Sequence, residues 1–415
     1  MTKPYDVIVI GGGASGLVAA YSAANAGAHT LLLEKQKRLG RKLSATGNGR
    51  CNLSHVGFSQ ENFHSEEIFF SHQVLERFDE KATLAFFDRL GVSPIYDDQG
   101  RYYPRSLQAG AVVDVLRFAC AEAGVTIHTE EEVVSLQMRY PNYELVSNQG
   151  HYQAKAVVVA CGGKAYTQLG ADEGGYRLLE GFGHGRTALY PGIVQLDSSL
   201  KACKSLAGQK WDCHCQLWVD DQASPYHDLG EVLFTDYGLS GPPILQLSSP
   251  SIRAQAQGHK VALQLDLFPT LAEEDLIRLL QKRGEAFDQR SKVDSFIGFL
   301  PRIMATALLS HLGYQPLDKP AKDLSPKDWE KIAKTLKAWV FPITGHQGWK
   351  SAKVTLGGIA TPDFNPASLE SWLSPGLYAC GEVLDVDGDC GGYNLQWAWS
   401  SGYVAGSEAG LFAIT

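Results

Sequence analysis

The feature that most constrains how this chain can fold is a group of glycines that directly follows an apolar segment. Residues 7–10 read Val-Ile-Val-Ile, a continuous apolar run typical of a strand buried on both faces. Gly11, Gly13 and Gly16 follow it with the spacing G-x-G-x-x-G. Glycine permits a tight turn at the first position, close approach of a pyrophosphate at the second and close helix packing at the third. This spacing predicts a strand, turn and helix that bind a dinucleotide.

The residues after the glycines complete a βαβ unit. Apolar residues recur at helical spacing over 17–24, and Gly27 can end that helix. Residues 30–33 predict a second strand that ends at Glu34. Glu34 stands eighteen positions after Gly16, where an acid suits a ribose diol, and the helix N-terminus suits a pyrophosphate. In this context we favour dinucleotide binding over a purely structural turn.

The rest of the chain predicts a domain that is interrupted by another. A small antiparallel meander is indicated by three strand-like segments, residues 133–138, 143–147 and 152–160. Short alternating strands, frequent Pro and Gly, and polar-faced helices begin near Tyr190, and glycine-rich sequence returns after residue 354. We therefore expect an α/β protein with a first domain part at 1–190, an inserted mixed β/α substrate domain at 191–354 and a second domain part at 355–415.

Two helix starts are predicted inside the inserted region. Thr270 and Glu273 have the spacing of a capping box. Ser325 suits an N-cap and Pro326 suits the first helical position.

Composition narrows the possible function. The 415 residues are 44% hydrophobic and 20% charged, as in an ordinary globular chain. A net charge of −8 argues against nucleic acid as a partner without excluding a local basic patch. The charge-free stretches 7–33 and 390–407 contain glycines or polar residues throughout, so neither predicts a membrane span. Eight cysteines and no secretory leader lead us to expect reduced thiols and a cytoplasmic location.

Three groups resemble metal or redox sites, and we discount them. Cys213 and Cys215 fall on one face of a predicted strand, where thiols pack as small core residues. Asp385 begins an alternation of aspartates like that of a calcium loop, but Gln396 stands at the twelfth position in place of glutamate. Cys51 lacks a C-x-x-C partner and is expected to pack. No metal site is therefore expected.

Two polar, glycine-rich segments carry a resemblance to a known family. Residues 40–52 read GRKLSATGNGRCN, and residues 376–396 read GLYACGEVLDVDGDCGGYNLQ. Together with LFTDYGLSGPP at 233–243, they closely resemble the BaiN-type NAD(P)/FAD-dependent oxidoreductases. This bacterial flavoprotein family also contains aminoacetone-oxidase-like members and a ribosomal RNA dihydrouridine synthase. The resemblance covers essentially the whole chain, and residues 45–48 look most like the aminoacetone-oxidase-like branch.

The resemblance implies a doubly wound, Rossmann-like FAD-binding domain of the glutathione-reductase type that holds FAD without a covalent bond. It assigns the pyrophosphate to Gly11, Gly13, Ala14, Ser15 and Gly16, the adenosine ribose to Glu34 with Lys35 beside it, and adenine to the backbone of Val133. A loop along the pyrophosphate and the flavin contains Arg41, Lys42, Gly47, Asn48 and Asn52. The ribityl chain is assigned to Gly381 and Glu382, and the pyrimidine edge of the flavin to Gly392, Tyr393, Asn394, Leu395 and Gln396.

The resemblance implies an FAD-dependent oxidoreductase that acts on a small organic substrate, with an aminoacetone-oxidase-like amine oxidase as the first expectation. One alternative is an NAD(P)H-dependent reductase of a conjugated C=C bond, in a bile-acid-like substrate or in RNA uridine. Another is a flavin redox sensor without enzymatic activity. The sequence contains no second G-x-G-x-x-G fingerprint for NAD(P), so any nicotinamide would dock transiently as electron donor. The catalytic residues and the oligomeric state are left open.

Overall fold

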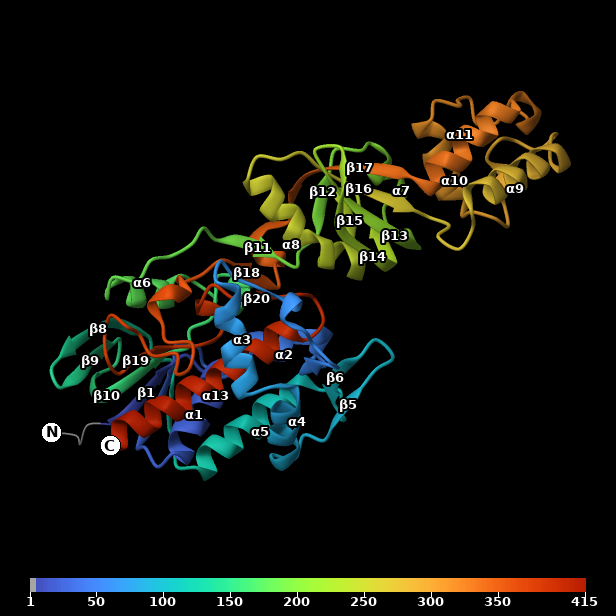
Figure 1. Ribbon diagram of the computed structural model, residues 1–415. Coiled ribbons are helices and arrows are strands. Elements are labelled where there is room, and N and C mark those ends of the chain that lie inside the picture. The colour runs from blue at the N-terminus through green and yellow to red at the C-terminus, as the bar shows by residue number, and fades with distance from the viewer. Residues whose placement is uncertain (1–4) are drawn as a thin grey trace. The chain divides into compact units, whose positions relative to one another are not determined.

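The computed structural model describes residues 5–415, which form two compact units. The first contains the chain up to Pro191 together with Lys353–Thr415, and the second contains Gly192–Ala352 (Figure 1). These borders lie within two residues of those expected from the sequence. The first unit has a parallel and antiparallel sheet covered by helices, and the expectation of an α/β, Rossmann-like fold is confirmed.

The first unit is built on a seven-stranded sheet in the order β7-β2-β1-β10-β9-β8, with β19 paired to β10. The predicted βαβ unit is present as β1 (Tyr5–Ile10), α1 (Ala14–Asn25) and β2 (Thr30–Glu34). β1 lies between β2 and β10 (His151–Val159) and is parallel to both. Because β1 has strands on both sides and helices over the sheet, the apolar run 7–9 is fully buried.

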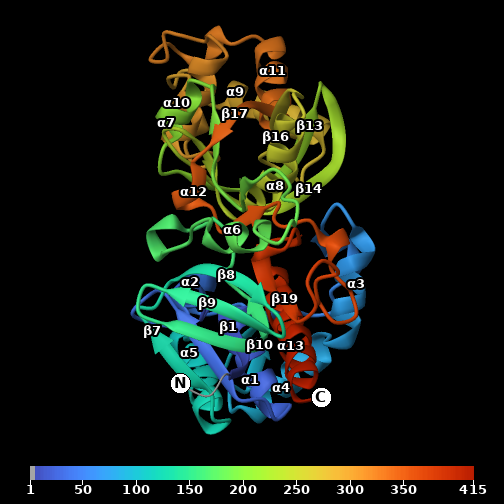
Figure 2. The same cartoon turned by 90° about the vertical axis from the view of Figure 1, so that its left-hand side faces the viewer.

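The remaining elements of this unit complete the sheet and its cover (Figure 2). The meander is formed by β8 (Val133–Arg139), β9 (Asn142–Ser147) and β10, and the other sheet strands are β7 (Thr126–Thr129) and β19 (Leu377–Ala379). The helices are α2 (Arg41–Ala45), α3 (Ile68–Arg77), α4 (Glu80–Arg89), α5 (Ala109–Glu122), α6 (Gly174–Glu180) and α13 (Tyr393–Ile414). Short strands are β3 (Ser54–His55), β4 (Phe63–His64), β5 (Pro94–Tyr96), β6 (Arg101–Pro104), β11 (Tyr190–Gly192), β18 (Val354–Leu356) and β20 (Asp387–Gly388).

Helix α13, from the C-terminal part of the chain, packs closely along α1, from the N-terminal part (Figure 1). Gly402, Gly406 and Gly410 recur every fourth residue and therefore lie on one face of the helix. A Cβ atom at Gly406 would lie 2.2 Å from the carbonyl oxygen of Ala19, and one at Gly402 would lie 2.5 Å from that of Ser15. Only glycine allows this approach, so the C-terminal segment is fixed against the first helix of the nucleotide-binding motif.

The second unit contains a closed barrel in the order β12-β15-β14-β13-β16-β17. Its strands are β12 (Leu196–Ser198), β13 (Lys210–Val219), β14 (Gln222–Phe234), β15 (Gly238–Ser240), β16 (Val261–Asp266) and β17 (Trp339–His346). Its helices are α7 (Ala202–Leu206), α8 (Pro242–Ala256), α9 (Glu273–Ala286), α10 (Arg302–His311), α11 (Pro326–Lys337) and α12 (Gly348–Ser351). Cys213 and Cys215 are fully buried in β13, as expected for core residues.

The two helix starts expected in this unit have different outcomes. Ser325 caps α11 and forms a capping box with Asp328, as its place before a proline predicts. The capping box at Thr270 is wrong, because α9 is preceded by Ala272, which makes no side-chain cap. Residues 269–271 instead form a turn in which the amide of Leu271 donates to the carbonyl of Phe268.

Candidate functional site

The three glycines of the first turn have different structural roles. Gly11 has a φ of +108°, and a Cβ atom there would lie 2.5 Å from the carbonyl oxygen of Ala160. A Cβ atom at Gly16 would lie 1.8 Å from the carbonyl oxygen of Gly11. At Gly13, by contrast, a Cβ atom would meet no atom within 4 Å. Gly11 and Gly16 are therefore required by packing, whereas Gly13 borders open space at the N-terminus of α1.

The N-terminus of α1 is available to an anion. Its N-cap is Gly13, which has no side chain to cap the helix, and no acidic residue lies in the first turn. The amides of Ala14 and Ser15 lie in this turn, and helix N-termini of this kind attract phosphate through their N–H groups and dipole. Ser15 is buried, and Gly381 packs so closely on it that a Cβ atom at Gly381 would lie 2.4 Å from its Oγ.

Glu34 holds the turn to the end of β2. Its Oε2 accepts a hydrogen bond of 2.7 Å from the amide of Gly12, and its Oε1 accepts one of 2.7 Å from the amide of Gln36. Burial raises the pKa of the Glu34 carboxyl, against the lowering effect of these backbone hydrogen bonds. Its carbonyl oxygen accepts from the amide of Glu131, which brings the start of β8 at Val133 to the same end of the sheet.

The loop after β2 and the C-terminal segment meet through an ion pair. Lys42 Nζ donates to Glu382 Oε2 at 2.5 Å, although 340 residues separate them. The other oxygen of Glu382 accepts from the amide of Thr355 at 2.6 Å, and Gly163 lies against the same carboxylate. Thr355 was not predicted, because no short-range pattern marks a threonine whose amide binds a carboxylate distant in the sequence.

Arg41 and Lys35, the other basic residues predicted to bind the cofactor, form hydrogen bonds or ion pairs with other residues. Arg41 Nη1 donates to Gln36 Oε1 at 2.5 Å, and Lys35 Nζ lies 2.5 Å from Asp172 Oδ2. The structure therefore brings Lys42 directly to Glu382. Arg41 instead bonds to Gln36, just after β2, and Lys35 pairs with Asp172, just before α6.

The start of α13 forms the second half of the site. Gly391 and Gly392 have φ angles of +142° and +109°, conformations that favour glycine. A Cβ atom at Gly392 would lie 2.6 Å from the carbonyl oxygen of Ser54 and 2.7 Å from Asn52 Oδ1. Within residues 5–415, the buried Oδ1 of Asn52 has no hydrogen-bond partner. A buried acceptor without a partner next to a helix N-terminus indicates a place for a donor that a ligand would supply.

The side chains of Asn394 and Gln396 are committed to the protein itself. Asn394 Nδ2 donates to the carbonyls of Gly388 and Asp389, and its Oδ1 accepts from the amide of Gly388. Gln396 is fully buried, and its side chain forms hydrogen bonds with Ser54, Phe78, Thr83 and Ser400. This turn can therefore offer a ligand its backbone N–H groups, but not these two side chains.

The remaining predicted residues lie around these two halves. Tyr393 is buried and stacks on the ring of His55 with centroids 5.0 Å apart, and Leu395 is half-buried. Gly47 and Asn48 follow α2 with φ angles of +56° and +54°, and Asn48 is in a region rare for a residue with a side chain. These positive angles form the tight turn that leads to Asn52.

Cys51 is a packing residue in this structure. It is fully buried, and burial raises the pKa of its thiol to about 12, so the thiol is protonated at neutral pH. Across the described range 5–415, no group of three or more His, Cys, Asp or Glu residues could hold a metal ion. No helix within the same range is both long enough and apolar enough to cross a membrane.

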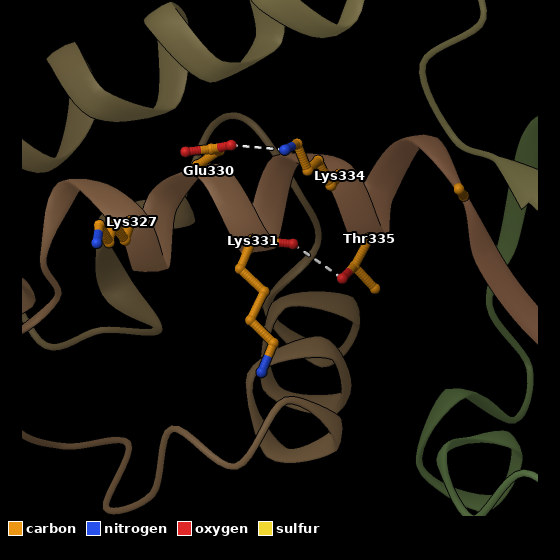
Figure 3. Close-up of a pocket in the computed structure, with 6 residues that line it drawn as sticks. Lys327, Glu330, Lys331, Lys334 and Thr335 are labelled. Atoms are coloured by element: carbon orange, nitrogen blue, oxygen red, sulfur yellow. Dashed lines mark hydrogen bonds and ion pairs between the residues drawn. The ribbon is translucent and has the colours of Figure 1, made fainter.

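A surface hollow in the second unit has no part in this site. It is lined by Lys327, Glu330, Lys331, Lys334, Thr335 and Ala338, all on α11 or directly after it (Figure 3). Lys334 pairs with Glu330 at 2.5 Å, which is an ordinary i,i+4 pair on an exposed helix face. None of these residues was predicted to bind a cofactor.

The uncapped helix N-terminus, the open space at Gly13, the anchored Glu34 and the orphaned acceptor of Asn52 together fit a dinucleotide. A Rossmann-type βαβ unit whose site is completed by a C-terminal helix defines a dinucleotide-binding oxidoreductase class. Comparison with known proteins identifies the family. Residues 5–408 match the model described as the HI0933-like protein Rossmann domain.

Two curated relatives align over almost the whole chain. The 3-dehydro-bile acid delta(4,6)-reductase of Clostridium scindens is 34% identical over 404 residues, which is 97% of this chain and 98% of the relative. The ribosomal RNA dihydrouridine synthase of Escherichia coli is 30% identical over 404 residues, with the same coverage. The chain belongs to the HI0933-like family of Rossmann flavoproteins, which confirms the BaiN-type resemblance. It is an FAD-dependent oxidoreductase, as predicted.

Proposed function

We propose that this protein uses NAD(P)H to reduce a C=C bond conjugated with a carbonyl group in a small organic substrate. The observation that carries this proposal is the pair of relatives that align over 97% of the chain. One is named as a delta(4,6)-reductase of a 3-dehydro bile acid and the other as a dihydrouridine synthase. Both names describe the addition of hydrogen to a C=C bond that is conjugated with a carbonyl group.

The arrangement of the site supports a role in FAD binding for most predicted groups, but not for the side chains of Asn394 and Gln396, which form hydrogen bonds within the protein. We assign the pyrophosphate to the N-terminus of α1 beside Gly13, because that helix end is uncapped and borders open space. Glu34 then lies at the adenosine ribose and Val133 at the adenine, since both are at one end of the sheet. The assignment of the pyrophosphate therefore depends on the uncapped N-terminus of α1 and on the open space beside Gly13.

The Lys42–Glu382 pair and the start of α13 are assigned to the other half of the cofactor. Lys42 brings a positive charge and Glu382 a hydrogen-bond acceptor, as the pyrophosphate and the ribityl hydroxyls require. The backbone N–H groups after Gly392 and the acceptor of Asn52 suit the pyrimidine edge of the flavin. When bound, FAD supplies the hydride transfer, while these residues bind and orient it.

The expectation of an aminoacetone-oxidase-like amine oxidase is not confirmed by the relatives, whose names describe reductive reactions. We retain amine oxidation and reduction of uridine in RNA as outcomes of the test. The negative net charge gives no support to a broad RNA-binding surface.

Anaerobic stopped-flow mixing tests the proposal. Holoenzyme is mixed either with aminoacetone alone, or first with NADH or NADPH and then with a 4-en-3-one steroid, a uridine-containing RNA fragment or buffer. The absorbance of oxidised flavin is followed in each case. We expect the nicotinamide to bleach the flavin and the steroid to restore its absorbance. Bleaching by aminoacetone but not by NAD(P)H would instead assign an amine oxidase. Absence of bleaching by either would contradict any enzymatic role and favour the redox sensor.

A further inference from the structure

We propose that Tyr166 donates the proton in this reduction and that Lys353 positions and stabilises its phenol group. The inference rests on the proposed function. Lys353 Nζ donates a hydrogen bond of 2.5 Å to the Tyr166 hydroxyl oxygen, and it lies 4.8 Å from the centroid of the same ring. The two residues are 187 positions apart and both belong to the first unit.

The direction of this hydrogen bond leaves the phenol proton free. Because the ammonium group of Lys353 donates, the hydroxyl of Tyr166 acts as acceptor and keeps its own hydrogen for another partner. Within residues 5–415, the Tyr166 hydroxyl makes no other hydrogen bond and Lys353 pairs with no carboxylate. The full positive charge of Lys353 therefore faces the phenol, where it would stabilise a phenolate after proton loss.

The backbone of Tyr166 is held in an unfavourable conformation. Its φ and ψ are +67° and +51°, the left-handed region that bulky residues rarely adopt. It directly precedes a short 3₁₀ helix at Thr167–Leu169 and lies seven positions after Val159, the last residue of β10. Strained residues of this kind persist where the surrounding structure requires one side-chain direction, and they cluster at functional sites.

Thr355 ties both residues to the Glu382 segment. Its Oγ accepts hydrogen bonds of 2.8 and 3.0 Å from the amides of Lys164 and Ala165, directly before Tyr166. Its own amide donates to Glu382, and Lys353 lies two positions before it, directly before β18 begins at Val354. The Tyr166–Lys353 pair is therefore anchored beside the carboxylate that we assign to the ribityl chain, which leads directly to the reacting ring.

Other candidate acids near this segment are fully buried or have a raised pKa. Tyr176 is fully buried, and burial raises the pKa of its phenol. Cys161 is held protonated, since burial raises the pKa of its thiol to about 12. The imidazole of His184 is also fully buried, between Ser371 and Asp363. Tyr166 is also buried, with 9% of its surface exposed, but it differs from Tyr176 because its hydroxyl is paired with the ammonium group of Lys353.

The proposed step balances in atoms and electrons. The π bond of the substrate breaks, the hydride supplied through the cofactor forms a C–H bond at the carbon β to the carbonyl, and the Tyr166 proton forms one at the α carbon. The donor NAD(P)H is oxidised to NAD(P)⁺ as the C=C bond is reduced. The phenolate left on Tyr166, paired with the Lys353 ammonium, then takes a proton from water.

The test compares Tyr166→Phe, Lys353→Met and Lys353→Arg with Tyr176→Phe as the matched control. For each holoenzyme, one measures FAD content, flavin reduction by NAD(P)H and reoxidation by the 4-en-3-one steroid; the melting temperature of each apoprotein is the readout independent of activity. We expect Tyr166→Phe to slow reoxidation by about 100-fold or more. Its FAD content, flavin reduction and melting temperature should remain unchanged. Lys353→Met should also slow reoxidation, and Lys353→Arg should recover most of it because the charge is kept.

Each contrary result has a defined meaning. Equal reoxidation by Tyr166→Phe and wild type would overturn the inference while the proposed function stands. A lower apoprotein melting temperature with loss of FAD in Tyr166→Phe would assign the hydroxyl a structural role and also overturn it. If wild-type enzyme is reduced by NAD(P)H but not reoxidised by any unsaturated carbonyl compound, the proposed function itself fails, and the inference fails with it.

Discussion

Substitution of Gly13 by alanine should separate cofactor binding from folding. Gly13 has φ −82° and ψ −165°, which an alanine adopts without strain, and a Cβ atom there meets no atom within 4 Å. Alanine is less favourable than glycine at an N-cap by up to about 1 kcal/mol. The stiffer unfolded chain offsets this by about 0.4–1 kcal/mol. The free energy of unfolding of the apoprotein should therefore remain within about 1 kcal/mol of wild type.

The affinity for FAD should respond much more strongly. The added methyl group occupies the space that we assign to the pyrophosphate, so the Kd for FAD should rise at least about 100-fold, or about 2.7 kcal/mol. Gly16→Ala provides the contrast, because its Cβ would lie 1.8 Å from the carbonyl oxygen of Gly11. Overpacking of this kind costs about 1–3 kcal/mol, so this variant should lose stability of the apoprotein itself.

Two measurements decide between these expectations. Urea unfolding followed by circular dichroism gives the stability of each apoprotein, and quenching of FAD fluorescence on titration gives its affinity. Gly110→Ala on α5 is the neutral control, since a Cβ atom there also meets nothing within 4 Å and Gly110 is not a predicted site residue. If Gly13→Ala binds FAD as wild type does, the assignment of the pyrophosphate to this turn is refuted.

Three further predictions follow from single side chains. Asn394→Ala should lower the free energy of unfolding by about 2 kcal/mol, measured by urea unfolding, because three hydrogen bonds to the backbone of residues 388–389 are lost. An unchanged stability would contradict this structural role. Burial lowers the pKa of His184, against the raising effect of the nearby Asp363, so the unfolded chain binds its proton more readily. Stability should therefore fall as pH drops below about 6.5, and urea unfolding at several pH values should show a smaller fall in His184→Gln; equal falls would count against it. Brief alkylation at neutral pH followed by mass spectrometry should modify the exposed Cys390 before the buried Cys51, and the reverse order would disprove the burial argument.

The sequence by itself determined the local elements and the family. The apolar run 7–10 and the spacing of Gly11, Gly13 and Gly16 predicted β1, the turn and α1, because strand burial and tight turns depend on residues close in the chain. The meander over 133–160 and the cap at Ser325 were predicted for the same reason. The failed cap at Thr270 shows that such a pattern also occurs where the chain turns before the helix begins.

Only the tertiary structure decided how distant segments complete the site. The Lys42–Glu382 ion pair joins residues 340 positions apart, and the Tyr166–Lys353 pair joins residues 187 positions apart. The sequence placed Asn394 and Gln396 at the start of the last helix, but not the backbone and side-chain partners that use up their hydrogen-bonding groups. These contacts depend on how α13 packs on α1 through Gly402 and Gly406, and such long-range packing is set by the whole fold and has no local periodicity.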